Sequence, residues 1–274
     1  VPHIRDVRMY TLICDDFLSL HERHDEQYDV IVTSPPYNIG IEYDEYSDYL
    51  EEVDFLRFLQ RVSLKMYRML DEDGSLFINL SSPPSDPLRV YGMLKAIEVC
   101  NGFWHLQNTI HWIKAISIGE ENYGHYKPVN SKRYLSGMHE YIFHFTKTGA
   151  VQLDKDAVGV PYTDKSNASR WKKKKDVRDR GNVWYIPYET RTKADLHPCS
   201  FPVLLPEMCI RLHGLTDTLR VLDPFMGTGA TGVACRRLGV PTFTGVDISE
   251  AYVAAAEEKI RSASKEEFSS QPCI

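Results

Sequence analysis

Four consecutive residues combine groups that could recognise a flat polar ring: the hydroxyl of Ser34, the prolines Pro35 and Pro36, and the aromatic ring of Tyr37. They follow Tyr28–Val32, a run of strand-forming residues, almost directly. Proline cannot donate to a β-ladder and restricts φ, so the strand must end in a rigid turn. Such a turn presents hydrogen-bond acceptors beside a stacking face, which suits a ring that carries an amino group. An ordinary strand-terminating turn is the alternative.

A second group of residues with chemical potential follows the apolar run Leu219–Leu222. The sequence Asp-Pro-Phe-Met-Gly-Thr-Gly-Ala-Thr at 223–231 has two glycines that let the backbone approach a ligand, and the helix expected after them would point free N–H groups at it. The spacing matches neither a G-x-G-x-x-G fingerprint nor a P-loop. One strand later, Asp247 could accept hydrogen bonds from both hydroxyls of a ribose. Together these features predict a nucleoside site.

The net charge of −6 conceals an uneven distribution of charged residues. Residues 127–193 hold 15 Lys and Arg against 7 Asp and Glu, whereas the rest of the chain holds 17 against 31. The most basic stretch, 170–180, has seven basic residues around Trp171, and Trp184 follows it. A solvated lysine-rich loop would have the same composition. The aromatic residues favour a nucleic-acid surface, because such rings stack on bases.

Alternating strand and helix patterns supply the framework for these groups. Apolar runs predict strands at 9–14, 28–32, 75–80, 106–113, 140–145, 219–222 and 242–246. Helical spacing predicts helices at 17–20, 48–70, 86–100, 203–212, 232–238 and 249–262, with Asp71–Gly74 ending the second and Ser249 capping the last. Residues 118–138 are expected to form a loop. The alternation indicates an α/β fold with a mostly parallel sheet that is covered on both faces.

The composition is that of a globular protein, with no apolar run of about 18 residues and no signal-peptide pattern. We therefore expect no membrane association and a cytoplasmic location. The six cysteines are scattered and include no C-x-x-C pair, so neither a disulfide framework nor a metal site is expected. The 274 residues could form one large domain with an insertion, or two small domains.

The motifs at 33–38 and 223–231 resemble the catalytic and cofactor motifs of S-adenosylmethionine-dependent DNA amino-methyltransferases. The resemblance covers most of the chain, and the order of the two motifs resembles the permuted β group of that family. It implies a doubly wound, mostly parallel, seven-stranded Rossmann-like sheet with a basic inserted target-recognition region. The implied divisions are a catalytic part with the target-base loop at 1–146, a target-recognition region at 147–193, and the cofactor-binding part of the same catalytic domain at 194–274.

The resemblance also assigns roles to individual residues. The catalytic loop would consist of Ser34, Pro35, Pro36 and Tyr37. Cofactor contacts would come from the loop residues Asp223, Pro224, Phe225, Gly227, Thr228, Gly229 and Thr231, from Asp247 at the ribose, from Asp15 or the adjacent Asp16 at the adenine, and from His197 and Phe201 beside the pocket. Contacts to duplex DNA would come from Arg170, Trp171, Lys172, Lys173, Lys174, Lys175, Arg178 and Arg180. The segment that begins His139-Glu140 resembles the lining of the target-base pocket.

The implied reaction moves a methyl group from S-adenosylmethionine to an exocyclic amine of a flipped base. An aromatic amine is a weak nucleophile because its lone pair is delocalised into the ring. Acceptors at Ser34 and the Pro35 carbonyl would localise that pair, and Tyr37 would stack on the base. The sulfonium is itself the activated leaving group, so no metal is required. Serine at position 34 favours cytosine N4 over adenine N6, for which the family usually has Asp or Asn.

Other classes of protein are alternatives. Cytosine C5 methylation needs a thiolate, and Pro198-Cys199 lies outside the Pro-Pro-Tyr loop. An RNA or protein amide methyltransferase would share the cofactor site and the loop. A catalytically silent nucleic-acid-binding module would not need the intact loop. For a DNA enzyme, we expect a monomer or dimer that works beside a cognate restriction endonuclease.

Overall fold

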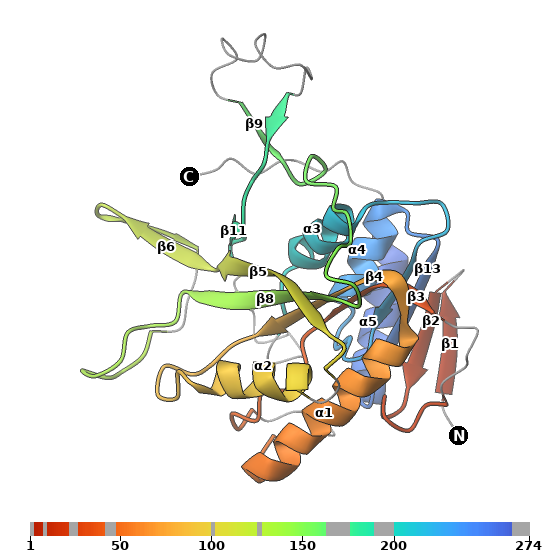
Figure 1. The fold of residues 1–274 in the computed structure, drawn as a ribbon, viewed down its shortest axis with the longest axis horizontal. Coiled ribbons are helices and arrows are strands. Elements are labelled where there is room, and N and C mark those ends of the chain that lie inside the picture. The colour runs from red at the N-terminus through yellow and green to blue at the C-terminus, as the bar shows by residue number, and fades with distance from the viewer. Residues whose placement is uncertain are drawn as a thin grey trace.

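Nine strands from the described parts of the chain pair into one central sheet in the computed structural model (Figure 1). Their order is β1 (His3–Val7), β2 (Tyr10–Cys14), β13 (Thr242–Asp247), β12 (Arg220–Asp223), β3 (Tyr28–Thr33), β4 (Leu70–Leu80), β8 (His139–Thr146), β5 (His105–Ile113) and β11 (Val183–Tyr185). All pairs from β2 to β4 are parallel, and β8 is antiparallel to both of its neighbours. The seven inner strands confirm the predicted sheet, while the edge strands β1 and β11 were not predicted.

The structure describes residues 3–7, 10–21, 27–41, 48–99, 102–124, 128–162, 176–188 and 200–264. Several residues with predicted roles lie outside these ranges: Arg170, Trp171, Lys172, Lys173, Lys174, Lys175 and His197. Within the described ranges, no helix is both long enough and apolar enough to cross a membrane.

Helices cover both faces of the sheet, and the side chains of β3 show why. Val30 and Val32 belong to one core cluster and Ile31 to the other, because alternate side chains of a strand point to opposite faces. The first cluster packs under α3 (Leu204–His213), α4 (Ala230–Leu238) and α5 (Glu250–Ser262). The second packs under α1 (Glu52–Met69) and α2 (Arg89–Val99). Burial on both faces accounts for the continuous apolar run in the sequence.

Four local predictions differ from the structure. Residues 17–20 form a turn instead of a helix, and α1 begins at Glu52, after Asp48. Residues 71–74 lie within β4, at an irregularity where Leu70 pairs with Tyr28 but Ser75 already pairs with Val30. The predicted loop 118–138 contains part of a hairpin formed by β6 (Ala115–Ile118) and β7 (Glu121–Gly124). Local patterns therefore located the elements, and pairing with neighbours determined their ends.

The segment 147–193 contributes more to the core than its lack of periodicity suggests. A short ribbon forms between β9 (Val160–Pro161) and β10 (Val177–Arg178), and β11 pairs in parallel with β5. Trp184 lies opposite Trp112 in that pairing, is 1% exposed, and donates its indole N–H to the Gly181 carbonyl. The prediction that Trp184 belongs to a nucleic-acid surface is therefore wrong, because the edge of the sheet buries its ring.

Replacing Trp184 with Ala should lower the free energy of unfolding by about 3–5 kcal/mol, because it leaves a cavity under β11. The neighbouring Val183, which is 56% exposed, gives the matched control, and Val183→Ala should change stability by less than about 0.5 kcal/mol. Urea unfolding followed by far-ultraviolet circular dichroism measures both. Equal stability of the two variants would contradict the burial of Trp184.

Candidate active site

An open cavity of about 1170 Å³ lies at the carboxyl ends of the parallel strands. Ligands bind at this edge in open α/β sheets, because the loops there diverge. Both sequence motifs reach it, together with the ends of β2, β4 and β13; the lining includes Asp15, Ser34, Tyr37, Asn79, Phe225 and Asp247. The volume exceeds the roughly 300–1,000 Å³ that is usual for a single small-molecule site, so it leaves room for a nucleoside and a second flat ring.

The loop after β3 is held from behind by Asp48. Its carboxylate accepts hydrogen bonds from the backbone N–H groups of Asn38 (2.8 Å), Ile39 (2.9 Å) and Ile41 (3.1 Å), and the residue is only 1% exposed. Asn38 itself has a φ of 54°, and its side chain bonds both ways to the backbone of Leu50. The sequence pattern predicts that Asp48 starts a helix. It instead makes the turn rigid, a role that its sequence position does not reveal.

Hydrogen bonds around Tyr37 orient the hydroxyl of Ser34. The Tyr37 hydroxyl lies 3.0 Å from the Asn79 carbonyl, 3.2 Å from Asn79 Oδ1 and 2.9 Å from Ser34 Oγ. Both oxygens of Asn79 can only accept, and its amide nitrogen donates to the Tyr141 carbonyl. The phenolic proton of Tyr37 is therefore directed to Asn79. Ser34 then donates to Tyr37, which leaves the lone pairs of Ser34 Oγ available as acceptors.

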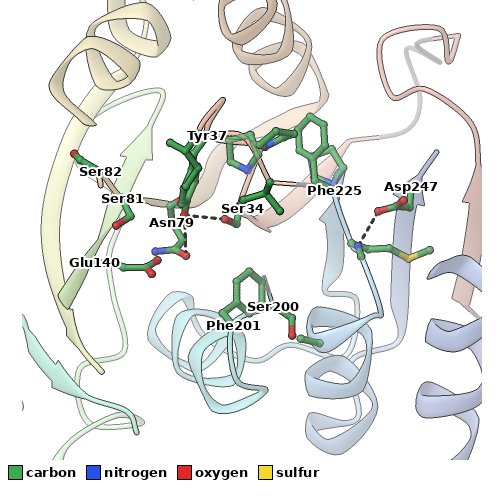
Figure 2. Close-up of a pocket in the computed structure, with 18 of the residues that line it drawn as sticks. Ser34, Tyr37, Asn79, Ser81, Ser82, Glu140, Ser200, Phe201, Phe225 and Asp247 are labelled. Carbon is green, nitrogen blue, oxygen red and sulfur yellow. Dashed lines mark hydrogen bonds between the residues drawn. The ribbon is translucent and has the colours of Figure 1, made fainter. Parts of the chain in front are cut away.

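Figure 2 places Ser34 between two halves of the cavity. Tyr37 and Asn79 lie beside it toward Ser81, Ser82 and Glu140, whereas Phe225 and Asp247 lie on the opposite side. A group bound against Ser34 would therefore face both halves.

Asp223 joins the two motifs from beneath the cavity. Its carboxylate accepts from the hydroxyls of Thr33 (2.8 Å) and Thr231 (2.6 Å) and from the N–H of Phe225 (3.1 Å). It is 1% exposed and is not among the residues that line the cavity. Burial raises the pKa of Asp223 to about 6, against the opposing effect of these hydrogen bonds. The structure thus gives Asp223 a supporting position instead of a place in the cavity wall.

Asp247 occupies the place predicted for a ribose-binding acid. It lines the cavity at the end of β13, and its carboxylate accepts from the N–H groups of Gly227 (2.9 Å) and Ser249 (3.0 Å). Burial raises the pKa of this carboxyl, and the backbone donors oppose that shift. The Asp247 carbonyl also accepts from the Asp15 N–H (3.0 Å), which brings the ends of β2 and β13 together.

The glycine loop reaches the cavity through only some of its residues. Pro224, Phe225 and Gly227 line it, whereas Thr228, Gly229 and Thr231 do not. Gly229 has a φ of 85°, and a Cβ there would lie 2.8 Å from the Cβ of Ala256. Glycine is therefore required at this position by the packing of α4 on α5 and by the turn. The Thr228 hydroxyl accepts from Lys259 of α5 (3.0 Å), so this side chain faces away from the cavity.

An aromatic group lies in the half of the cavity that contains Asp247. The Phe225 ring makes edge contacts with Phe17, at 6.2 Å between centroids, and with Phe58, at 6.1 Å. Asp15 and Asp16 both line the cavity beside them, and Phe201 lines it from the segment before α3. An aromatic platform, a carboxylate that can accept from ribose hydroxyls and an apolar wall suit an adenosine group, so these residues fit S-adenosylmethionine.

The opposite half of the cavity contains an ion pair that sequence reading did not identify. Lys114 Nζ lies 2.9 Å from Glu140 Oε1, and both side chains are largely buried in the lining. His139 also lines this half, and burial lowers its pKa. Glu140 lies in the segment expected to line the target-base pocket, but Lys114 and Asn79 were not predicted. Lys114 and Asn79 each lie at or beside the end of a predicted strand, and this position is the sequence signal that could have identified them.

Two of the predicted DNA contacts lie in the described ranges. Arg178 is exposed on β10, whereas Arg180 donates to the Val158 carbonyl (2.8 Å) and so supports the β9–β10 ribbon. Neither residue lines the cavity. The remaining predicted contacts, at 170–175, lie outside the described residues.

The raised pKa of Asp223 predicts a specific pH dependence of stability. Its folded-state pKa of about 6 exceeds the ordinary value of 3.8, so the folded state binds this proton more tightly than the unfolded state does. The stabilising contribution of the Asp223 proton to folding is complete below about pH 4 and is lost as the pH rises through 6. Relative to Asp223→Asn, the wild type should lose roughly 3 kcal/mol of unfolding free energy across that interval. Parallel curves from chemical denaturation at several pH values would contradict the assignment.

Comparison with known proteins agrees with this geometry. A family model for DNA methylases (N6_N4_Mtase) matches residues 28–258. The chain is 30% identical over 266 residues to the type II methyltransferase M1.MboII of Moraxella bovis, covering 90% of this chain and 93% of the relative. It is 27% identical over 277 residues to the type II methyltransferase M.SmaI of Serratia marcescens, covering 86% and 85%.

Solved structures share the fold. The PvuII DNA methyltransferase (cytosine-N4-specific) superimposes with a TM-score of 0.64 at 20% identity, over 92% of this chain and 89% of that one. A putative DNA modification methylase of Thermus thermophilus, in complex with S-adenosyl-L-methionine, gives a TM-score of 0.58 at 25% identity, over 93% of each chain. With both motifs at one cavity and the family model spanning most of its length, the chain belongs to the S-adenosylmethionine-dependent DNA amino-methyltransferases.

Proposed function

We propose that this protein methylates the exocyclic N4 amine of a flipped cytosine in duplex DNA. The observation that carries the proposal is the orientation of Ser34. Because the Tyr37 hydroxyl donates its own proton to Asn79, Ser34 donates to Tyr37, and Ser34 Oγ offers only lone pairs to the cavity. An amine is the group that such an acceptor binds. Adenine N6 is the alternative target.

Ser34 and Pro35 would act on the nucleophile. If Ser34 Oγ and the Pro35 carbonyl each accept one N–H of the amine, the nitrogen becomes more pyramidal and its lone pair localises as the transition state forms. S-adenosylmethionine supplies the methyl group on a sulfonium, which leaves as a thioether. The new N–C bond would form as the C–S bond breaks, and the amine would then release one proton to water.

Tyr37 and its neighbours would hold the base in line. The Tyr37 ring lies at the cavity wall with its hydroxyl anchored on Asn79, and Asp48 holds the backbone that follows it. This anchoring limits how far the ring can move, so that a base stacked on it keeps one distance from the cofactor half. The rigid loop supplies position, and Ser34 supplies the electronic effect.

Two features favour cytosine over adenine. Ser34 is the residue that usually accompanies cytosine N4 in the amino-methyltransferases this sequence resembles. In addition, Lys114 lines the half of the cavity opposite the cofactor residues, and an ammonium group has three donors, one of which is directed to Glu140. Cytosine carries the acceptor O2 on the edge where adenine has a C–H group. The structural neighbour that is cytosine-N4-specific shares the fold, which alone does not select the base.

Two further proposals concern DNA recognition and the biological role of the protein. Parts of the predicted recognition region pack into the core at Val151, Val158 and Trp184, so DNA recognition would fall to the stretch between the β9–β10 strands. The lysine run 172–175 in that stretch would contact phosphates. The similarity to type II methyltransferases supports a role in a restriction–modification system, with a cognate endonuclease acting on the same site.

Product analysis tests the proposed base. The protein is incubated with unmodified phage DNA and labelled S-adenosylmethionine, and the DNA is digested to nucleosides and analysed by mass spectrometry. We expect N4-methyldeoxycytidine, and modification-sensitive sequencing of the same DNA locates the methylated site. N6-methyldeoxyadenosine would establish the alternative, and label that enters only RNA or protein would overturn action on DNA.

Substitutions in the loop separate its two roles. Ser34→Ala should reduce single-turnover methyl transfer by about 100-fold or more, because the oriented acceptor is lost. Tyr37→Ala should have a comparable effect, whereas Tyr37→Phe keeps the ring and should lose less. Cofactor affinity, measured by isothermal titration calorimetry, should be unchanged in all three. Loss of cofactor binding in the Ser34 and Tyr37 variants would mean that the loop belongs to the cofactor site.

A further inference from the structure

The loop 128–138 carries the most exposed large apolar side chain among the residues for which exposure is known. Leu135 is 90% exposed, compared with 73% for Tyr49 and 72% for Leu88. An isolated exposed leucine is common on protein surfaces and proves nothing alone. The position of Leu135, the rigidity of its loop and the neighbouring charges together indicate a functional role.

The loop stands at the edge of the cavity. Pro128, Val129 and Gly137 are among the lining residues, and the loop leads directly into His139 and Glu140 at the start of β8. In Figure 1 it is the yellow-green trace that leaves the start of β8 and projects beyond the sheet, on the same side as the β6–β7 hairpin. Its tip therefore lies outside the half of the cavity that would receive the base.

Hydrogen bonds close the neck of this loop. The Val129 N–H donates to Ser136 Oγ (3.2 Å), and the Val129 carbonyl accepts from the Ser131 N–H (2.9 Å). Ser131 Oγ in turn accepts from the Arg133 N–H (3.1 Å), and the Met138 carbonyl accepts from the Lys114 N–H (2.8 Å). A loop braced in this way loses little conformational entropy when it binds a partner.

The tip has the charges of a DNA-contacting surface. Lys132 and Arg133 are both exposed next to Leu135, and residues 128–138 contain no acidic side chain. The Arg133 guanidinium lies 5.0 Å from the centre of the Tyr134 ring, which supports its orientation. Two cations beside a protruding aliphatic side chain match a duplex, in which phosphates flank an apolar base stack.

We propose that the loop 128–138 enters the duplex at the methylation site, where Leu135 fills the space that the flipped base leaves in the stack. Lys132 and Arg133 contact the flanking phosphates. Base flipping sacrifices stacking and pairing, and an apolar wedge lowers that cost. This inference rests on the action on duplex DNA, and it does not depend on which amine is methylated.

The test uses two duplex oligonucleotides that carry the mapped methylation site. In one the target base is normally paired, and in the other it lies opposite an abasic position. Leu135→Ala should slow single-turnover methylation of the paired duplex at least tenfold, yet remain within about threefold of the wild type on the unpaired one, where flipping costs less. Leu215 is another exposed leucine and precedes β12, so it lies toward the amino ends of the parallel strands, away from the cavity. Leu215→Ala should therefore match the wild type on both duplexes.

Equal losses on the two duplexes, or no loss on either, would overturn the wedge. Salt dependence tests the phosphate contacts separately: replacing Lys132 and Arg133 with Ala should reduce the slope of log K against log salt by about 2, while Leu135→Ala leaves it unchanged. Neutralising Lys172 to Lys175 should also reduce the slope of log K against log salt. It should not slow methylation of the paired duplex more than methylation of the unpaired one. Failure of the wild type to methylate either duplex would count against the proposed function, whereas an active wild type with an indifferent Leu135 would overturn only this inference.

Discussion

A single buried carboxylate holds the two chemical motifs of this protein together. Asp223 ends β12 and accepts hydrogen bonds from Thr33 at the end of β3 and from Thr231 in α4. The loops of the two motifs are therefore anchored to one group, although 190 positions of sequence separate Thr33 from Asp223. Burial makes this anchor costly as an anion, as its raised pKa shows.

The residues that would touch the reactants are positioned by others that would not. Asp48 fixes the backbone after Tyr37, and Asn79 fixes the Tyr37 hydroxyl, which in turn orients Ser34. On the opposite side of the cavity, the Gly227 N–H donates to the Asp247 carboxylate. Catalysis of this kind depends on position and on oriented acceptors, which must be set before the substrate arrives. The supporting hydrogen bonds are thus as much part of the site as the lining is.

The charged residues of the protein are unevenly distributed along the chain. The body of the chain is acidic, whereas the basic residues are concentrated between 127 and 193. This uneven field would direct a polyanion to one face of an otherwise repulsive surface. The braced loop 128–138 lies in that basic part and borders the cavity, so its location would link DNA attraction to access of the base.

The sequence by itself determined the inner strands and the two motif loops, because apolar periodicity, proline and glycine act locally. It could not show that Asp48 clasps a loop instead of beginning a helix, that Trp184 is buried, or that Gly229 serves helix packing. Nor could it bring Asn79 and Lys114 to the cavity. Those outcomes depend on partners distant in the chain, and only the tertiary structure decides which donor meets which acceptor and which ring an edge strand covers.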